Sequence, residues 1–296
     1  PTPTPTPTPP PPRQWIEVRN VDLRLNDAIT LRIRAIHGEI VRTTPDRPAA
    51  LDDPTSFRIN VSAGTVALTG DDVAALLNTV ILAYAGSPLT DVTVHLAGDH
   101  LIAIGALHTG GTSHRVELTG TVDVTPDSRI RLHVLRAHVL GINGEQLLHT
   151  LGLHLDDVVH LTGARGATIK GDDIFLDPLP FLPPPSIAGH LAAVHIDGDR
   201  LVEDFATTDD DAAFQHAVRA DTSGNFIYVK GGDLRFGRLL MRDTDVRMYG
   251  GDGATPFDLD LPHYTRQLVA GYSRTRADSG LIVYMPNVAS LATAQR

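Results

Sequence analysis

Alternation of apolar and polar residues is the feature that most constrains the fold of this chain. Val92, Val94 and Leu96 alternate with polar residues, and the same pattern recurs over residues 116–119 and 130–134. Because successive side chains of a strand point to opposite faces, a period of two predicts half-buried antiparallel strands. The chain is therefore expected to be rich in β-hairpins.

Short turns that contain Gly, Pro or Asp separate the alternating segments. Each turn lies between apolar runs and carries a residue type that a tight hairpin needs. The turns are Ala97-Gly98-Asp99-His100, Thr125-Pro126-Asp127-Ser128, Lys170-Gly171-Asp172-Asp173 and Asp197-Gly198-Asp199-Arg200. Their recurrence predicts a β-meander, although the spacing is too irregular for a solenoid.

Two helices are expected to interrupt the strands. Residues 69–72 fit a helix cap, and an apolar stripe at helical spacing runs from Val73 to Tyr84, with a stop near Gly86. A shorter second helix is expected to begin at Asn143.

Composition argues against several classes of protein. Lys and Arg number 25 against 35 for Asp and Glu, so the formal net charge is −10, which disfavours a nucleic-acid partner. The chain has no cysteine, which removes disulfides, thiolate metal sites and cysteine nucleophiles. No run of about 18 apolar residues is present, so no membrane-spanning helix is expected.

Fourteen histidines invite a metal-site interpretation that their spacing does not support. His190 and His195 would point to opposite faces of one strand, and no H-E-x-x-H motif occurs. No G-x-S-x-G nucleophile motif is present either. We therefore expect no metal site, no cofactor and no catalytic residue, and a protein that is not an enzyme. A hydrolase acting on an envelope lipid or glycan stays open as a third possibility.

Some strands are apolar at every position, as in residues 101–104 and 174–176. A strand that is apolar on both faces needs a cover on each side, and only one long helix and one short helix are expected. One solution curls the sheet around the helix of residues 69–86 and leaves an apolar groove, which suits acyl chains. The alternative, an ordinary sheet-on-helix core, is favoured by these residues alone.

Four segments carry a resemblance to a known family. They are LTGDDVAALLNTVIL from Leu68, VTVHLAGDHLIAIGAL from Val92, VDVTPDSRIRLHV from Val122 and LAAVHIDGDRLV from Leu191. Over about residues 55–205 the chain resembles the TULIP (tubular lipid-binding) superfamily, and within it the LmeA-like phospholipid-binding proteins of the bacterial envelope. The resemblance implies a sheet wrapped on a helix, an apolar cavity, and binding or transfer of lipid.

We therefore expect an α+β fold in which a curved antiparallel sheet wraps around one long helix, with a short second helix and a β-rich C-terminal segment. Residues 1–14 are expected to form a Pro/Thr-rich linker, residues 15–205 a lipid-binding-like α+β domain, and residues 206–296 a C-terminal β-rich extension packed on it. Within the extension, residues 231–250 are expected either to close the sheet or to form a docking surface.

The expected function is non-enzymatic, extracytoplasmic binding of a phospholipid or another long apolar ligand in the cell envelope. Phe181 and Leu182, which lie among prolines, are expected to gate the mouth or contact a membrane, or else to pack as an ordinary loop. Trp15 is expected to lie near a headgroup layer. The residues expected to line the cavity are Leu76, Val80, Ile81, Ile102, Ile104, Leu132 and Val134.

The alternative is a structural accessory subunit that braces a membrane protein complex through a lipid-binding fold. The expected partners are a lipid and either a membrane surface or a membrane protein complex, with no nucleic acid. The expected location is the periplasm or another extracytoplasmic space, with a tether to a membrane through an upstream segment.

Overall fold

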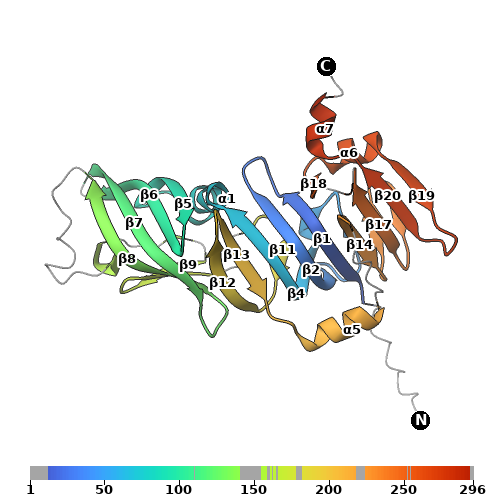
Figure 1. Cartoon of the computed structure of the whole chain (residues 1–296), viewed down its shortest axis with the longest axis horizontal. Helices are drawn as coiled ribbons and strands as arrows, with labels where there is room; N and C mark the ends of the chain where they lie inside the picture. The colour runs from blue at the N-terminus through green and yellow to red at the C-terminus, as the bar shows by residue number, and fades with distance from the viewer. Residues whose placement is uncertain are drawn as a thin grey trace, which may run out of the picture.

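The computed structural model describes residues 13–109, 111–140, 155–158, 161, 163–164, 166–177, 182–217, 224–251, 253 and 255–293. The molecule is elongated, with a six-stranded sheet at one end and a larger sheet that extends to the other (Figure 1). A third, small sheet has three strands in the described part of the chain.

The six-stranded sheet is antiparallel throughout, in the order β5-β6-β7-β8-β10-β9. Its strands are β5 (Leu89–Ala97), β6 (His100–Thr109), β7 (Thr112–Val124), β8 (Ile130–Leu140), β9 (Ala167–Lys170) and β10 (Asp173–Leu176).

The large sheet runs β12-β13-β4-β2-β1-β14-β17-β20-β19, with β11 paired to β4 and β18 paired to β1. Its strands are β1 (Trp15–Arg24), β2 (Thr30–Arg42), β4 (Phe57–Thr69), β11 (Ser186–Ala188), β12 (Leu191–Asp197), β13 (Arg200–Phe205), β14 (Phe226–Lys230), β17 (Asp245–Gly250), β18 (Phe257–Asp260), β19 (Tyr272–Thr275) and β20 (Leu281–Met285).

The small sheet has the order β16-β15-β3. Its strands are β3 (Ala49–Ala50), β15 (Leu234–Phe236) and β16 (Leu239–Met241). The helical segments of the described chain are η1 (Pro54–Ser56), α1 (Gly70–Leu76), η2 (Leu77–Ile81), α3 (Leu155–Val158), α5 (Asp209–Ala217), α6 (Tyr264–Ala270) and α7 (Val288–Thr293).

The expected hairpins are confirmed. Gly98, Gly171 and Gly198 adopt positive φ angles of 63°, 61° and 63° in the turns that join β5 to β6, β9 to β10 and β12 to β13. Ser128, with φ of 62°, completes the turn between β7 and β8. A positive φ is easily adopted by glycine, which explains why turns of this composition appear three times.

The expected α+β fold class is wrong, because the described chain is predominantly β and no single long helix within it is wrapped by a sheet. The capping box at Thr69 and Asp72 is present, so the helix starts where expected. It continues only as the π-helical turn η2, which ends at Ile81.

Two polar side chains account for the early end of this helix. Asn78 donates from Nδ2 to the Val92 carbonyl at 2.7 Å and accepts from the Val92 N–H at 2.9 Å, which ties the last turn to β5. Thr79 donates to the Ala75 carbonyl at 2.7 Å, a contact that bends helices. The expected second helix from Asn143 lies outside the described residues.

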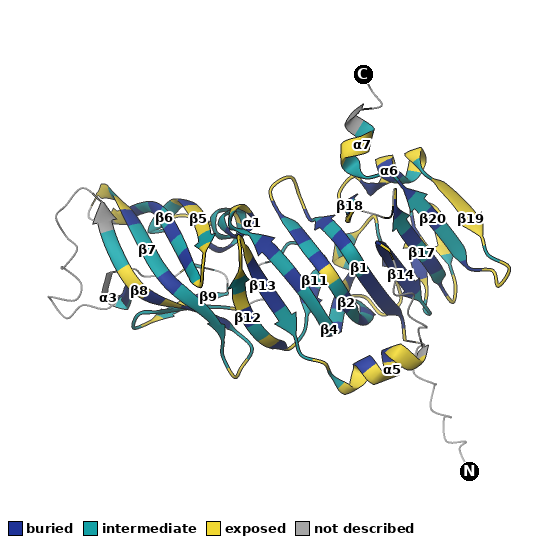
Figure 2. Ribbon diagram, viewed as in Figure 1, coloured by how far each residue is buried: buried dark blue, intermediate teal, exposed yellow. Residues whose placement is uncertain are grey.

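The large sheet crosses the expected domain boundary at residue 205. On one side β1 pairs with β2, and on the other it pairs with β14 and in parallel with β18. The strands β1 and β14 are buried at most positions, whereas the edge strand β19 is exposed (Figure 2). The division into residues 15–205 and 206–296 stays a prediction.

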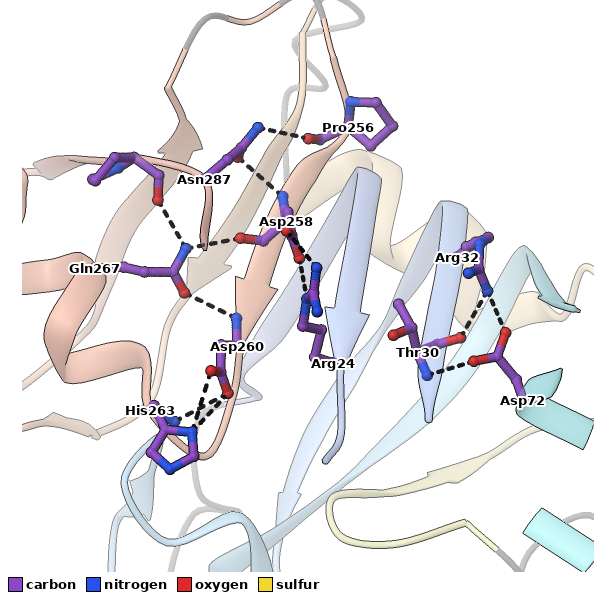
Figure 3. A network of polar contacts seen from close by, with 11 residues as sticks. Arg24, Thr30, Arg32, Asp72, Pro256, Asp258, Asp260, His263, Gln267 and Asn287 are labelled. Atoms are coloured by element: carbon purple, nitrogen blue, oxygen red, sulfur yellow. Dashed lines mark hydrogen bonds and ion pairs between the residues drawn. The ribbon is translucent and has the colours of Figure 1, made fainter. Parts of the chain in front are cut away.

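Polar contacts fasten the C-terminal elements to β1 (Figure 3). Arg24 binds the Asp258 carboxylate with both Nε and Nη2, at 2.6 and 2.8 Å. The buried Gln267 of α6 accepts from the Asp260 N–H at 2.9 Å and donates to the carbonyls of Asp258 and Pro286 at 2.7 and 2.8 Å. Gln267 therefore satisfies three backbone groups that packing has removed from water.

Candidate functional site

An apolar cavity of about 200 Å³ lies against one face of the six-stranded sheet. Leu201 of β13 lines it from the large sheet, so the cavity sits where the two sheets meet. Its wall is formed by Val73, Leu77, Ile81, Leu82, Leu89, Val92, Leu101, Ala103, Leu107, Val116, Leu118, Val122, Ile130, Leu132, Ala137, His138, Leu155, Leu161, Ala167, Ile169, Ile174, Leu176 and Leu201. Among these described residues, His138 carries the one polar side chain.

The pairing of β5 with β6 sets which side chains face the cavity. Val94 lies opposite Ala103 and Leu96 lies opposite Leu101, whereas the polar His95 lies opposite Ile102. Since residues opposite each other share a face, Leu101 and Ala103 face inward with the apolar side of β5.

The helical wall of the cavity comes from Val73, Leu77 and Ile81. Their spacing places them on one side of α1 and η2. The helix lies beside β5 (Figure 1), and Gly70 at its start leaves no room for a side chain, because a Cβ there would lie 2.3 Å from the Val94 carbonyl oxygen. This close approach holds the helix against the sheet edge.

The nine residues expected to bind ligand fall into separate places. Ile81 and Leu132 line the cavity. Leu76 and Val134 are buried in the core, and Val80 packs against it. The remaining residues lie elsewhere.

Ile102 and Ile104 are half-buried on the face of β6 opposite Leu101 and Ala103. Leu182 lines a second, much smaller cavity. Phe181 lies outside the described residues.

Sequence reasoning missed most of the wall. Residues 101–104 are apolar at every position, so periodicity alone cannot decide which pair faces inward. The signal that could have found Leu101 and Ala103 is the turn at Gly98 and Asp99, which fixes the register of β6 against the alternating strand β5.

The second cavity, of about 10 Å³, contains a buried acid that the sequence did not single out. Glu203 of β13 has 5% of its surface exposed, and its Oε1 has no hydrogen-bond partner in the described part of the chain. Burial raises the pKa of Glu203 from 4.5 to about 7. The other residues around this cavity are apolar: Leu31, Val66, Leu68, Leu182, Ile187, Gly189 and Phe205.

Trp15 does not reach the surface, contrary to expectation. It is 8% exposed and packs edge-on against Phe214 of α5, with 6.0 Å between ring centroids. Phe214 also stacks on His37, whose Nδ1 lies 2.8 Å from the buried Asp211 carboxylate. This cluster holds α5 against β2 and β4 of the large sheet.

Several histidines pair with carboxylates one at a time. His133 contacts Asp173 at 2.6 Å and His263 contacts Asp260 at 3.2 Å. Within the described ranges, no three His, Asp or Glu side chains converge in a way that could hold a metal ion. No helix in the same ranges has the length and apolar character needed to cross a membrane.

Comparison with known proteins identified no relative of this chain. A scan of protein-family models, a search of curated proteins and a search of solved structures each found no match to this chain. The TULIP resemblance accordingly stays a prediction.

Proposed function

We propose that this protein binds a hydrocarbon chain of a lipid, or another long apolar molecule, without performing chemistry on it. The observation that carries the proposal is the cavity against the six-stranded sheet, about 200 Å³ in volume and walled by apolar side chains. Burial of each methylene group contributes about 0.8 kcal/mol, so a wall of this kind favours hydrocarbon over water.

The volume indicates what part of a lipid fits. An engineered apolar cavity of about 150 Å³ stays dry and takes up benzene, whereas pockets for drug-sized ligands run from about 300 Å³ upward. At about 200 Å³ this cavity suits a segment of one chain better than two chains side by side. The ligand class is therefore a lipid that presents a single hydrocarbon chain.

The wall also supports binding in preference to catalysis. Apart from His138, the described lining residues offer no general base, nucleophile or charged group. A reaction at a lipid ester would need such groups within hydrogen-bond reach of the reacting atoms.

The location outside the cytoplasm belongs to the same proposal and rests on the Pro/Thr-rich residues 1–14. Detection of the native protein in fractionated cells tests it. Recovery in the cytosolic fraction would contradict this part of the proposal alone.

A displacement titration with a fluorescent long-chain fatty acid tests binding. Ala103 faces the cavity and Ala106 lies on the other face of the same strand. Ala103→Phe should weaken binding at least about tenfold, because the added ring displaces at least two methylene groups of the ligand, each worth about 0.8 kcal/mol. Ala106→Phe is the matched control and should bind like the wild type.

A second variant shows whether any loss of binding in Ala103→Phe comes from filling the cavity or from misfolding. Ala137→Leu fills the same cavity from β8 with a smaller side chain, and it should weaken binding in the same direction. Wild-type protein that binds no fatty acid, or cavity-filled variants that bind as well as Ala106→Phe, would overturn the proposal. Recovery of stable protein partners with an empty cavity would favour the accessory-subunit alternative.

A further inference from the structure

The hairpin of β15 and β16 presents two uncovered leucines on the edge of the small sheet. Leu239 and Leu240 are 49% and 48% exposed, in a strand that pairs only with β15 in the described chain. An exposed apolar edge strand promotes aggregation or binding to another surface, and an apolar patch of this kind often marks an interaction site.

Arginines surround these leucines. Arg238 and Arg242 directly flank Leu239–Met241, and Arg235 lies opposite Leu240 on β15. All three arginines are exposed. Arg235 pairs with Asp52 at 3.3 Å, whereas Arg238 and Arg242 make no ion pair with a described residue.

The hairpin is held firmly from behind. Leu234 and Phe236 of β15 are buried, and the Phe236 ring stacks on Tyr264 of α6 at 5.5 Å between centroids. The Gly237 N–H donates to the Tyr264 hydroxyl at 3.2 Å, at the turn where Gly237 takes a φ of 59°. The leucines and arginines are therefore displayed on a fixed support, which lowers the entropy cost of binding.

We infer that this hairpin docks on an anionic phospholipid bilayer. The side chains of Leu239 and Leu240 leave opposite faces of β16, so both would enter the acyl boundary with this edge strand lying along the bilayer surface. Arg238 and Arg242 at its two ends would contact lipid phosphates, the arrangement by which apolar and basic residues jointly bind an interface. The hairpin lies outside the proposed ligand cavity, so the inference goes beyond the proposed function and does not depend on it.

The net charge of −10 opposes binding to an anionic surface only at long range. Charges are screened over about 8 Å at physiological salt, so the groups nearest the bilayer decide the interaction. Exposed Asp233 and Asp243 lie at the base of the hairpin beside Arg242, so Arg238 at the turn is the hairpin cation farthest from these carboxylates.

Sedimentation with vesicles tests the inference on the full chain. The vesicles are phosphatidylcholine alone and an equal mixture of phosphatidylcholine and phosphatidylglycerol. Wild-type protein should bind the mixed vesicles more tightly. Arg238→Gln/Arg242→Gln should weaken that binding about 25-fold, because each basic residue near an anionic surface contributes a factor of about five.

The leucines are tested separately from the arginines. Leu239→Ser/Leu240→Ser should weaken binding at least about tenfold on the mixed vesicles, through loss of apolar burial. Matched controls remove exposed residues elsewhere: Arg34→Gln/Arg136→Gln for charge, and Leu135→Ser/Val269→Ser for apolar surface. Both controls should bind like the wild type.

Three outcomes would overturn the inference: wild-type protein that ignores vesicles, equal binding to both compositions, or control variants that lose as much binding as the hairpin variants. The fatty-acid titration separates the two proposals. Hairpin variants should keep fatty-acid binding, and Ala103→Phe should keep vesicle binding.

Discussion

The Asp72 carboxylate, in the first turn of α1, accepts a hydrogen bond from the backbone N–H of Thr30 at 2.9 Å. The same carboxylate pairs with Arg32 (Figure 3), and in the capping box it accepts a hydrogen bond from the Thr69 N–H at 2.8 Å. One buried side chain thus joins β2 to the helix that walls the cavity.

Replacing Asp72 should be costly. Asp72→Ala removes the capping box and leaves the partly buried Arg32 without its partner, so we expect a loss of about 3 kcal/mol in the free energy of unfolding. Urea denaturation measures it. Asp71→Ala removes the exposed neighbouring acid of the same turn and should cost well under 1 kcal/mol, about the value of a charge near a helix start. Equal losses in the two variants would contradict the role of Asp72.

Gln267→Leu should destabilise the C-terminal part of the large sheet. The leucine cannot bond the three backbone groups that Gln267 serves, and each unpaired buried group costs about 1–3 kcal/mol. The exposed neighbour Arg266 provides the control variant Arg266→Leu. Hydrogen exchange should show faster opening of β18 and β20 in Gln267→Leu alone, and unchanged protection there would argue against this role.

Glu203 should make stability depend on pH. Because burial raises its folded pKa to about 7, its protonated form stabilises the fold fully below pH 4.5, and that contribution is lost as the pH rises through 7. The free energy of unfolding of Glu203→Gln minus that of the wild type should therefore increase by about 3 kcal/mol between pH 4 and pH 8. Denaturation curves at several pH values check this, and a difference that does not vary with pH would show that Glu203 is not buried as an acid.

Leu132→Ala should enlarge the cavity and cost about 2–5 kcal/mol, as for other buried leucines. Ile102 lies on the face of β6 that points away from the cavity. Ile102→Ala should cost less than Leu132→Ala, because Ile102 is only half-buried. Thermal and chemical denaturation compare the two. A larger loss of unfolding free energy for Ile102→Ala would mean that Ile102, and not Leu101 or Ala103, faces the cavity.

Local structure was predictable where a residue type restricts the backbone. The turns at Gly98, Gly171 and Gly198 follow from glycine, and the helix start follows from Thr69 and Asp72. The helix length was not predictable, because Asn78 ends the helix by binding Val92, a contact made only after β5 has docked. Tertiary contact overrode the apolar stripe.

Long-range pairing was equally hidden from the sequence. Nothing in Val18 or Ile227 indicates that they lie opposite each other in β1 and β14, since many apolar strands could take either place. The residues of the cavity wall were ambiguous for the same reason. Ile102 and Ala103 are both apolar, and only the register of the hairpin decides which of them faces the cavity.

The central place of β1 in the large sheet has a consequence for how the chain is made. Residues Trp15–Arg24 leave the ribosome more than 200 residues before two of their three partner strands, Phe226–Lys230 and Phe257–Asp260. One edge of β1 stays unpaired while the residues between it and β14 are synthesised, and closing so long a loop is slow. During synthesis, β1 therefore stays exposed as an unpaired apolar strand that is prone to aggregation. A chaperone that binds extended apolar segments would raise the yield of folded protein.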